Sequence, residues 1–484
     1  MNFAILSFII GFILQFEALF LLLPWIVGMI YGEYHVALIY LATAVVCFIL
    51  GKLLSFRHTG RFKELYVREG FTAVALGWFV MSVFGAIPFV LTGEIPFYID
   101  ALFETISGFT TTGSSILSDV EALSYASLFW RSFTHWIGGM GVLVFLLSLL
   151  PLTGGSHVNL MKAESPGPSV GKLVPKVRQT AKYLYIIYFA LTMIEVIFLL
   201  FGGMNLFEAL TTSFGTAGTG GFAIWNDGFV SVSPYNQWVV TIFMLLFGVN
   251  FGFYFLILTG KLRDALKFEE VRIYFIIVIA AAVFIFINLR HFALYAPAEG
   301  IRQAFFQVAS IITTTGFASA DFNLWPETSR TILVLLMFIG ACAGSTGGGI
   351  KVSRFIIACK SFIKEIISYL HPRSVKKIKI EGKPLEHETL RATNVYFMTY
   401  MVIFAVSVLL VSIENKDLVT NFAAVAATFN NIGPGLSLVG PMANFGHFTD
   451  FTKYILMFDM LAGRLEIFPM MLLFCPAVWK RRRA

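Results

Sequence analysis

The chain has 484 residues, of which 57% are hydrophobic and only 13% are charged. Soluble globular domains carry about twice that share of charge, so this composition excludes one. The net charge of +7 comes from basic residues that cluster between the apolar runs, and it does not indicate a nucleic-acid partner. The apolar runs are each long enough to cross ~30 Å of hydrocarbon as a helix. The sequence therefore predicts an all-α, polytopic membrane protein.

The first two apolar runs predict two transmembrane helices, at about residues 3–31 and 36–55. They form an N-terminal unit of residues 1–65 that ends in a basic loop. The first run is too long for a signal peptide and has no basic start or small-residue cleavage site, so we expect it to be retained. The four cysteines have neither metal-ligand spacing nor a disulfide pattern.

Beyond residue 65 the sequence repeats one pattern four times: an outer apolar helix, a half-membrane helix, a polar loop and an inner apolar helix. We expect these units at residues 66–155, 156–262, 263–385 and 386–484. The predicted outer, half-membrane and inner helices lie at 68–92, 97–109 and 127–150; at 180–203, 205–215 and 236–260; at 271–290, 299–311 and 329–370; and at 392–413, 418–429 and 449–476. Only the third inner helix is expected to be interrupted. The pattern predicts four pseudo-symmetric helix–pore-helix–helix repeats around one central pore.

Each polar loop carries a glycine after a half-membrane helix. The loops read SGFTTTGSS, SFGTAGTGGF, QVASIITTTGF and ATFNNIGPGL, and their alignment places Gly113, Gly220, Gly316 and Gly433 in register. One such loop would be an ordinary helix end. Four copies indicate a ring of backbone carbonyls, because irregular backbone is tolerated in a membrane only where it is buried or lines a cavity.

The predicted selectivity filter consists of the residues that lead into each glycine. They are Thr111, Thr112, Gly113, Gly218, Thr219, Gly220, Thr314, Thr315, Gly316, Asn431, Ile432 and Gly433. The expected ion ligands are Thr111, Thr112, Thr219, Gly220, Thr314, Thr315, Asn431 and Ile432. Oxygen ligands without carboxylates favour a weakly hydrated monovalent cation over Mg²⁺ or Ca²⁺. The negative ends of four pore helices favour a cation as well.

The third inner helix contains a run of glycines that predicts a gate. The run is Gly344, Ser345, Thr346, Gly347, Gly348 and Gly349. Each glycine costs a helix about 1 kcal/mol relative to alanine. The break starts ~22 Å into the helix, so we place it inside the membrane, just below the filter. We expect a mobile intramembrane loop; a packing kink or a close helix crossing is the alternative.

Arg464 lies at a similar depth in the fourth inner helix. A central arginine costs at least ~2.5 kcal/mol on insertion, so we expect it to face the cavity. Asp459 and Glu466 lack the spacing that favours a pair on one helix, and a carbonyl of the glycine run is another possible partner. The arginine and the glycine run together predict a closed constriction. A structural ion pair between helices is the alternative for Arg464.

The charge pattern predicts the orientation and excludes several activities. Basic loops lie on the side away from the filters, so both termini are expected in the cytoplasm and the filters outside. The sequence has no nucleophile elbow, phosphate loop, zinc spacing or paired catalytic carboxylates. We therefore expect neither an enzyme nor a bound nucleotide on this chain.

The motifs FTTTGSS, FGTAGTGGFA, ITTTGFAS and NNIGPGLS resemble the Trk/Ktr/HKT superfamily of potassium transporters. The two N-terminal helices and the segments RSFTHWIGGMG, GSTGGGIKVSR and MLAGRLEIFP narrow this resemblance to the TrkH family, from end to end of the chain. Repeats two and four depart from the threonine pattern, so we expect a filter that is unsymmetrical in its side chains and weaker in selectivity.

The resemblance implies K⁺ uptake across the inner membrane through a gated, channel-like pore. It assigns the gate to the glycine run and Arg464. It also implies a homodimer and a separate cytosolic ring of the TrkA type that binds nucleotide. The alternatives are a symporter that couples K⁺ to Na⁺ or H⁺, and a conductor of Na⁺ or ammonium.

Overall fold

The computed structural model describes residues 1–56, 67–141, 177–371 and 377–479. Their regular secondary structure is helical apart from a short ribbon in which β1 (Lys379–Ile380) pairs antiparallel with β2 (Lys383–Pro384). Several predictions lie outside the described residues. They are the basic loop at 57–65, the end of the first inner helix at 142–150, the boundary between repeats at 155 and the basic tail at 480–483.

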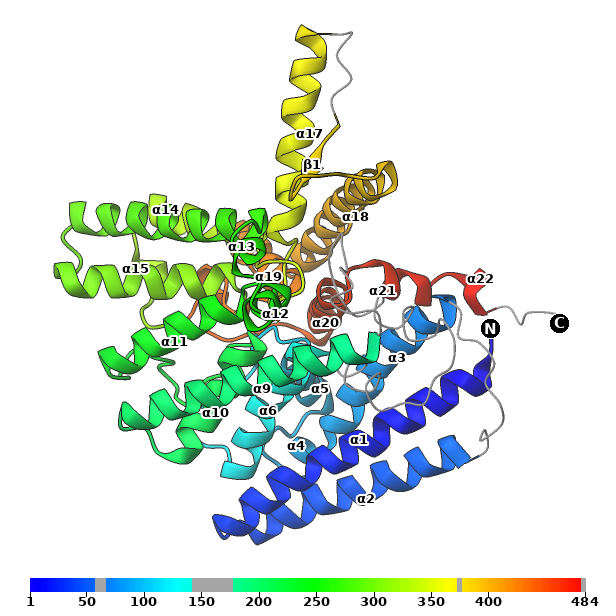
Figure 1. Cartoon of the computed structure of the whole chain (residues 1–484). Helices are drawn as coiled ribbons and strands as arrows, with labels where there is room; N and C mark the ends of the chain where they lie inside the picture. Colours follow the sequence, from blue (N-terminus) through cyan, green and yellow to red (C-terminus); the bar gives the residue numbers. More distant parts are fainter. Residues whose placement is uncertain (57–66, 142–176, 372–376, 480–484) are drawn as a thin grey trace.

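The two N-terminal helices are confirmed as α1 (Phe3–Ile30) and α2 (Tyr34–Phe56). The two helices lie very close together where they cross. A Cβ atom added to Gly11 would lie only 2.7 Å from the Gly51 carbonyl oxygen. Figure 1 shows the pair at one edge of the molecule, where α1 packs against α3.

Each repeat has an outer helix, a half-membrane pore helix and an inner helix, as predicted. The first repeat contains α3 (Val67–Gly85), α4 (Ile87–Leu91), α5 (Tyr98–Phe109) and α6 (Tyr125–Met140). The second contains α9 (Val177–Phe201), α10 (Leu206–Gly218), α11 (Pro234–Phe247), α12 (Phe251–Leu258) and α13 (Leu262–Ala265). The third contains α14 (Glu269–His291), α15 (Pro297–Ile312), the 3₁₀ turn η1 (Phe322–Leu324), α16 (Glu327–Ile339) and α17 (Val352–Leu370). The fourth contains α18 (His387–Val411), η2 (Ser412–Glu414), α19 (Leu418–Phe429), η3 (Ser437–Val439), α20 (Asp450–Arg464), α21 (Phe468–Leu473) and α22 (Pro476–Trp479).

Within the described part of the chain, six helices are long and apolar enough to cross a membrane. They are the N-terminal pair and the outer helix of each repeat, with α3 and α4 counted together. The second, third and fourth inner helices are shorter because each of them is broken, and the first is described only as far as Gly141. In Figure 1 the second half of the third one, α17, projects from the body next to α18.

The prediction of a single interrupted inner helix is wrong. The second inner helix bends by 89° between α11 and α12, and the fourth ends at Arg464, where Glu466 and Ile467 take positive φ angles. In the second, the Asn250 side chain caps a new helix by accepting the Gly252 N–H at 2.8 Å. The released Gly248 carbonyl accepts the Cys342 N–H of the third repeat at 3.0 Å. A neighbouring repeat therefore satisfies the backbone at this bend.

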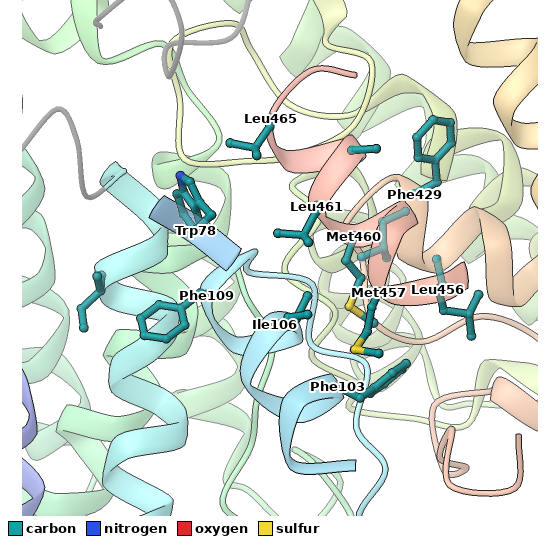
Figure 2. Packing of buried hydrophobic residues seen from close by; sticks show 14 of the residues in the cluster. Trp78, Phe103, Ile106, Phe109, Phe429, Leu456, Met457, Met460, Leu461 and Leu465 are labelled. Atoms are coloured by element: carbon teal, nitrogen blue, oxygen red, sulfur yellow. The ribbon is translucent and has the colours of Figure 1, made fainter. Parts of the chain in front are cut away.

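The fourth repeat packs against the first, which completes a closed arrangement of the four repeats. Phe103 and Ile106 of α5 face Met457 and Met460 of α20 in a buried apolar cluster (Figure 2). Polar bonds join the same repeats, including an ion pair of 2.5 Å between Lys453 and Asp100. The four repeats consequently form one ring around a central axis.

Glycines let two inner helices rest on the ends of their own pore helices. A Cβ atom on Gly138 of α6 would lie 2.0 Å from the carbonyl oxygen of Phe109, the last residue of α5. A Cβ on Gly463 of α20 would lie 2.1 Å from the carbonyl oxygen of Phe429, the last residue of α19. The first and fourth repeats therefore share this close contact.

Replacing Gly138 by alanine should destabilise the protein by about 1–3 kcal/mol, because the added methyl group overpacks a backbone contact. Thermal unfolding of the purified chain in detergent measures this. Gly300→Ala is the matched control, since a Cβ there meets its nearest neighbour, a Phe286 ring carbon, at 3.4 Å. Equal unfolding temperatures for the two variants would contradict the packing argument.

Candidate functional site

The four polar loops share one backbone conformation. After each pore helix, one residue takes a left-handed conformation with φ between 53° and 58°, and two positions later a glycine takes a φ of at least 81°. The left-handed residues are Thr111, Thr219, Thr314 and Asn431. The glycines that follow them are Gly113, Gly221, Gly316 and Gly433.

In the second repeat this glycine is Gly221, so the predicted alignment on Gly220 is shifted by one residue. The N–H of Gly220 bonds to the Gly215 carbonyl at 2.9 Å, just as the N–H of Thr112 bonds to the Ser107 carbonyl. Gly220 is therefore the counterpart of Thr112, Thr315 and Ile432. The sequence allows either register because Gly220 and Gly221 are adjacent, and the left-handed conformation of Thr219 makes Gly221 the glycine two positions after it.

The four glycines meet in a closed ring. A Cβ atom on Gly113 would lie 2.1 Å from the Gly220 carbonyl oxygen, and one on Gly221 would lie 2.0 Å from that of Thr315. A Cβ on Gly316 would lie 2.0 Å from the Ile432 carbonyl oxygen. One on Gly433 would lie 2.8 Å from that of Thr112, which closes the ring. Each repeat thus approaches the next too closely for any side chain.

The ring presents carbonyl oxygens that lack protein partners. Within the described residues, no hydrogen bond ends on the carbonyl oxygens of Thr112, Gly220, Thr315 and Ile432. The neighbouring hydroxyls are engaged instead, since Thr112 and Thr315 each share a bond of 2.8 Å with the threonine two positions earlier. Four unpaired carbonyl oxygens around one centre can replace water around a monovalent cation.

An open vestibule with a volume of about 140 Å³ lies over one side of the ring. All four positive-φ glycines line it, together with outer segments of each repeat, among them Trp225 and Pro441. The ring is therefore open to solvent on this side.

A buried ion pair supports the first two filter loops. Glu104 of α5 lies 2.6 Å from Arg131 of α6 and also accepts the Ile116 N–H at 3.0 Å. Arg131 donates to the Ala223 carbonyl at 2.8 Å and stacks on the Phe222 ring at 3.7 Å. The sequence analysis missed Glu104. The available signal in the sequence was a carboxylate, Glu104, in the middle of a largely apolar half-membrane helix.

His135 also holds these two loops together. Its Nδ1 lies 2.7 Å from the Gly108 carbonyl, and its Nε2 accepts the Phe222 N–H at 3.1 Å. This pattern requires a neutral ring with the proton on Nδ1. The ring also packs behind Gly220, where a Cβ would lie 2.1 Å from it.

The glycine run forms irregular backbone between α16 and α17, directly next to the filter. The Gly348 N–H donates to the hydroxyl of the filter residue Thr314 at 2.6 Å. The Gly344 carbonyl accepts the Phe251 N–H of the second repeat at 3.0 Å. The segment therefore contacts a filter loop and the broken inner helix of another repeat.

Arg464 reaches this loop from the fourth repeat. One guanidinium nitrogen donates to the Thr346 carbonyl at 2.8 Å, and the other donates to the Gly138 and Gly139 carbonyls at 2.6 and 2.9 Å. A loop carbonyl is thus one of its partners, as considered from the sequence. Glu466 pairs instead with Arg354, at 2.7 Å.

Lys351 is a further charged residue at the loop that the sequence analysis missed. It is 1% exposed, and its ammonium group donates to the Gly347 carbonyl. The available signal in the sequence was the pair of basic residues, Lys351 and Arg354, that follows the glycine run. Together with Arg464, Lys351 places two basic side chains at this loop.

Replacing Glu104 by glutamine should destabilise the protein by about 3–5 kcal/mol, because it leaves the buried Arg131 charge without its partner. Thermal unfolding in detergent measures the loss. Glu327→Gln is the control, since its ion pair with Arg330 leaves Glu327 82% exposed. A Glu104 variant as stable as this control would show that the buried pair does not support the filter loops.

Comparisons with known proteins agree with the fold and the motifs. A family model for TrkH, described as a cation transport protein, matches residues 39–481. The chain is 36% identical to the Trk system potassium uptake protein TrkH of Escherichia coli K12, over 99% of this chain and 100% of that one. It is 31% identical to the Trk system potassium uptake protein TrkG of the same organism, over 97% of each chain.

The solved structures include a close match along the whole chain. The crystal structure of the potassium transporter TrkH from Vibrio parahaemolyticus matches with a TM-score of 0.88 and 32% identity, over 99% of this chain and 100% of that one. Together with the family model, this shows that the chain belongs to the TrkH family of cation transport proteins.

Proposed function

We propose that this chain conducts K⁺ into the cell across the inner membrane through the ring formed by its four filter loops. The closed circle of glycine–carbonyl contacts carries the proposal. It sets four unpaired carbonyl oxygens around one centre, and such oxygens can substitute for the hydration shell of an ion. The relatives named above are potassium uptake proteins.

The ligand chemistry favours K⁺ over divalent cations. The filter residues offer carbonyl, hydroxyl and amide oxygens and no carboxylate, whereas Mg²⁺ and Ca²⁺ are usually held by charged oxygens. The ring residues Thr112, Gly220, Thr315 and Ile432 were all among the predicted ligands. An inside-negative potential contributes ~2.3 kcal/mol per charge per 100 mV, so a pore suffices for accumulation. No observation favours coupling to Na⁺ or H⁺, and we propose a pore rather than a symporter.

The glycine run and Arg464 form the proposed gate. The loop lies next to the filter, and Arg464 fixes it to the first repeat through the Gly138 and Gly139 carbonyls. A positive charge near the axis repels a cation. We propose that this is a closed constriction, which a cytosolic nucleotide-binding ring of the TrkA type opens from the side of the basic loops. The cytoplasmic placement of both termini and a homodimer belong to the same proposal.

Uptake of ⁸⁶Rb⁺ into proteoliposomes tests the filter. Unlabelled K⁺ should suppress this uptake more strongly than Na⁺ does. Gly316→Ala should reduce uptake at least about tenfold or erase the preference for K⁺, because a positive φ of 85° and a contact of 2.0 Å leave no room for the methyl group. Gly300→Ala serves as the control. Unchanged, K⁺-selective uptake by the Gly316 variant would refute the filter.

Two changes at the constriction test the gate. Deleting Gly344–Gly349 should raise ⁸⁶Rb⁺ uptake by the chain alone, since it removes the obstruction. Arg464→Ala should raise it by about two- to tenfold, because it releases the Thr346 carbonyl and removes a charge. Arg330→Ala, at a half-buried position in the first turn of α16 away from the loop, is the control. Folded variants with uptake like that of the unmodified chain would exclude a gate here, and loss of folded protein on Arg464→Ala would indicate a structural role instead.

A further inference from the structure

The outer helix of the third repeat holds both ends of the glycine loop through one side chain. Glu270 lies in the first turn of α14 and is 6% exposed. Its Oε1 atom accepts the Ala343 N–H at 2.7 Å and the Ser353 N–H at 3.0 Å. Ala343 directly precedes the glycine run, and Ser353 is the second residue of α17. One oxygen atom therefore joins the chain before the loop to the chain after it.

This bridge is incompatible with a continuous third inner helix. The two nitrogens lie no farther apart than the two bonds laid end to end, about 6 Å. Ala343 and Ser353 are ten positions apart, and ten residues of continuous helix span ~15 Å. While Glu270 holds both N–H groups, the segment between them must leave the helix path and return.

A carboxylate is well suited to this role. The N–H of Ser353 is one of the donors that the first turn of α17 cannot satisfy within the helix, and the positive end of the helix dipole favours a negative charge there. Bonds from N–H groups to a carboxylate are also stronger than those to a neutral oxygen. Without Glu270, two buried backbone donors would lose their partner.

Some of the other bonds on the loop come from the same repeat, where the Val352 N–H donates to the Ala341 carbonyl at 3.1 Å and the Gly348 N–H donates to the Thr314 hydroxyl, and others come from different repeats. Gly248 and Phe251 reach it from the second repeat and Arg464 from the fourth, so they fix its position relative to other repeats. Glu270 belongs to the same repeat as the loop and fixes its shape. We infer that Glu270 is a positioning residue of the gate, which keeps the third inner helix in its broken, obstructing form. This inference rests on the proposed function of the loop.

Two conservative variants separate the reach of the side chain from its charge. Glu270→Asp keeps the charge but shortens the side chain by ~1.5 Å, so that its oxygen cannot bridge both N–H groups. It should raise ⁸⁶Rb⁺ uptake by the full-length chain in proteoliposomes at least about fivefold. Glu270→Gln keeps the reach and an acceptor oxygen but loses the charge that strengthens the bonds, so it should raise uptake by about twofold at most, clearly less than Glu270→Asp does.

Glu269→Asp is the matched control. This neighbouring carboxylate pairs with Lys360 at 2.6 Å and accepts the Glu381 N–H, outside the loop. It should leave uptake unchanged. The inference is overturned if Glu270→Asp behaves like this control, or if Glu270→Gln raises uptake more than Glu270→Asp does, which would indicate that the charge of the side chain matters rather than its reach.

Introducing Glu270→Asp into a chain that lacks Gly344–Gly349 separates this inference from the proposed gate. If the deletion alone raises uptake and Glu270→Asp then adds nothing, the two changes act on one obstruction, as we expect. If the deletion raises uptake but Glu270→Asp has no effect in the intact chain, the loop is the gate and Glu270 does not position it. If the deletion has no effect while Glu270→Asp raises uptake, the loop is not the gate and the inference fails with it. The K⁺ preference over Na⁺ should be unchanged in all these chains, because Glu270 does not touch the filter.

Discussion

The structure depends on one steric constraint: at four positions, the backbone of one repeat approaches a carbonyl of the next too closely for a Cβ atom. Gly113, Gly221, Gly316 and Gly433 occupy these positions, and the contacts run in order around the ring. The short pore helices follow from this constraint, because they must end where the four chains meet. Further close contacts of the same kind seat Gly138 and Gly463 on the ends of the pore helices.

The backbone of the ring is nearly fourfold, whereas its supports are not. The first two loops rely on a buried ion pair between Glu104 and Arg131 and on a neutral histidine. In the third loop, the Thr314 hydroxyl accepts a hydrogen bond from the Gly348 N–H. The fourth uses the Asn431 amide, which donates to the Thr112 hydroxyl at 2.9 Å. Among the described residues, the glycine loop is therefore hydrogen-bonded to the third of these loops, and Gly348 also packs against Asn430 and Asn431 of the fourth.

Much of the fold could be predicted because hydropathy and local sequence determine it. The N-terminal pair and the pore helices appear within a few residues of their expected bounds, since apolar runs and helix-ending glycines are local signals. The filter register of the second repeat failed because Gly220 and Gly221 are adjacent, and only contacts with the neighbouring repeats decide between them. The bend before Asn250 was missed because the surrounding segment is uniformly apolar and its free carbonyl is satisfied by a distant loop. Glu270 gave no signal for a similar reason, since its partners are 73 and 83 positions away.

The most direct test of the central claim is to locate the ion. Crystals of the chain grown in Rb⁺ would give an anomalous signal at each bound cation. The account predicts a peak on the axis of the ring, within bonding distance of the carbonyl oxygens of Thr112, Gly220, Thr315 and Ile432. Peaks found only elsewhere, with none inside that ring at saturating Rb⁺, would contradict it.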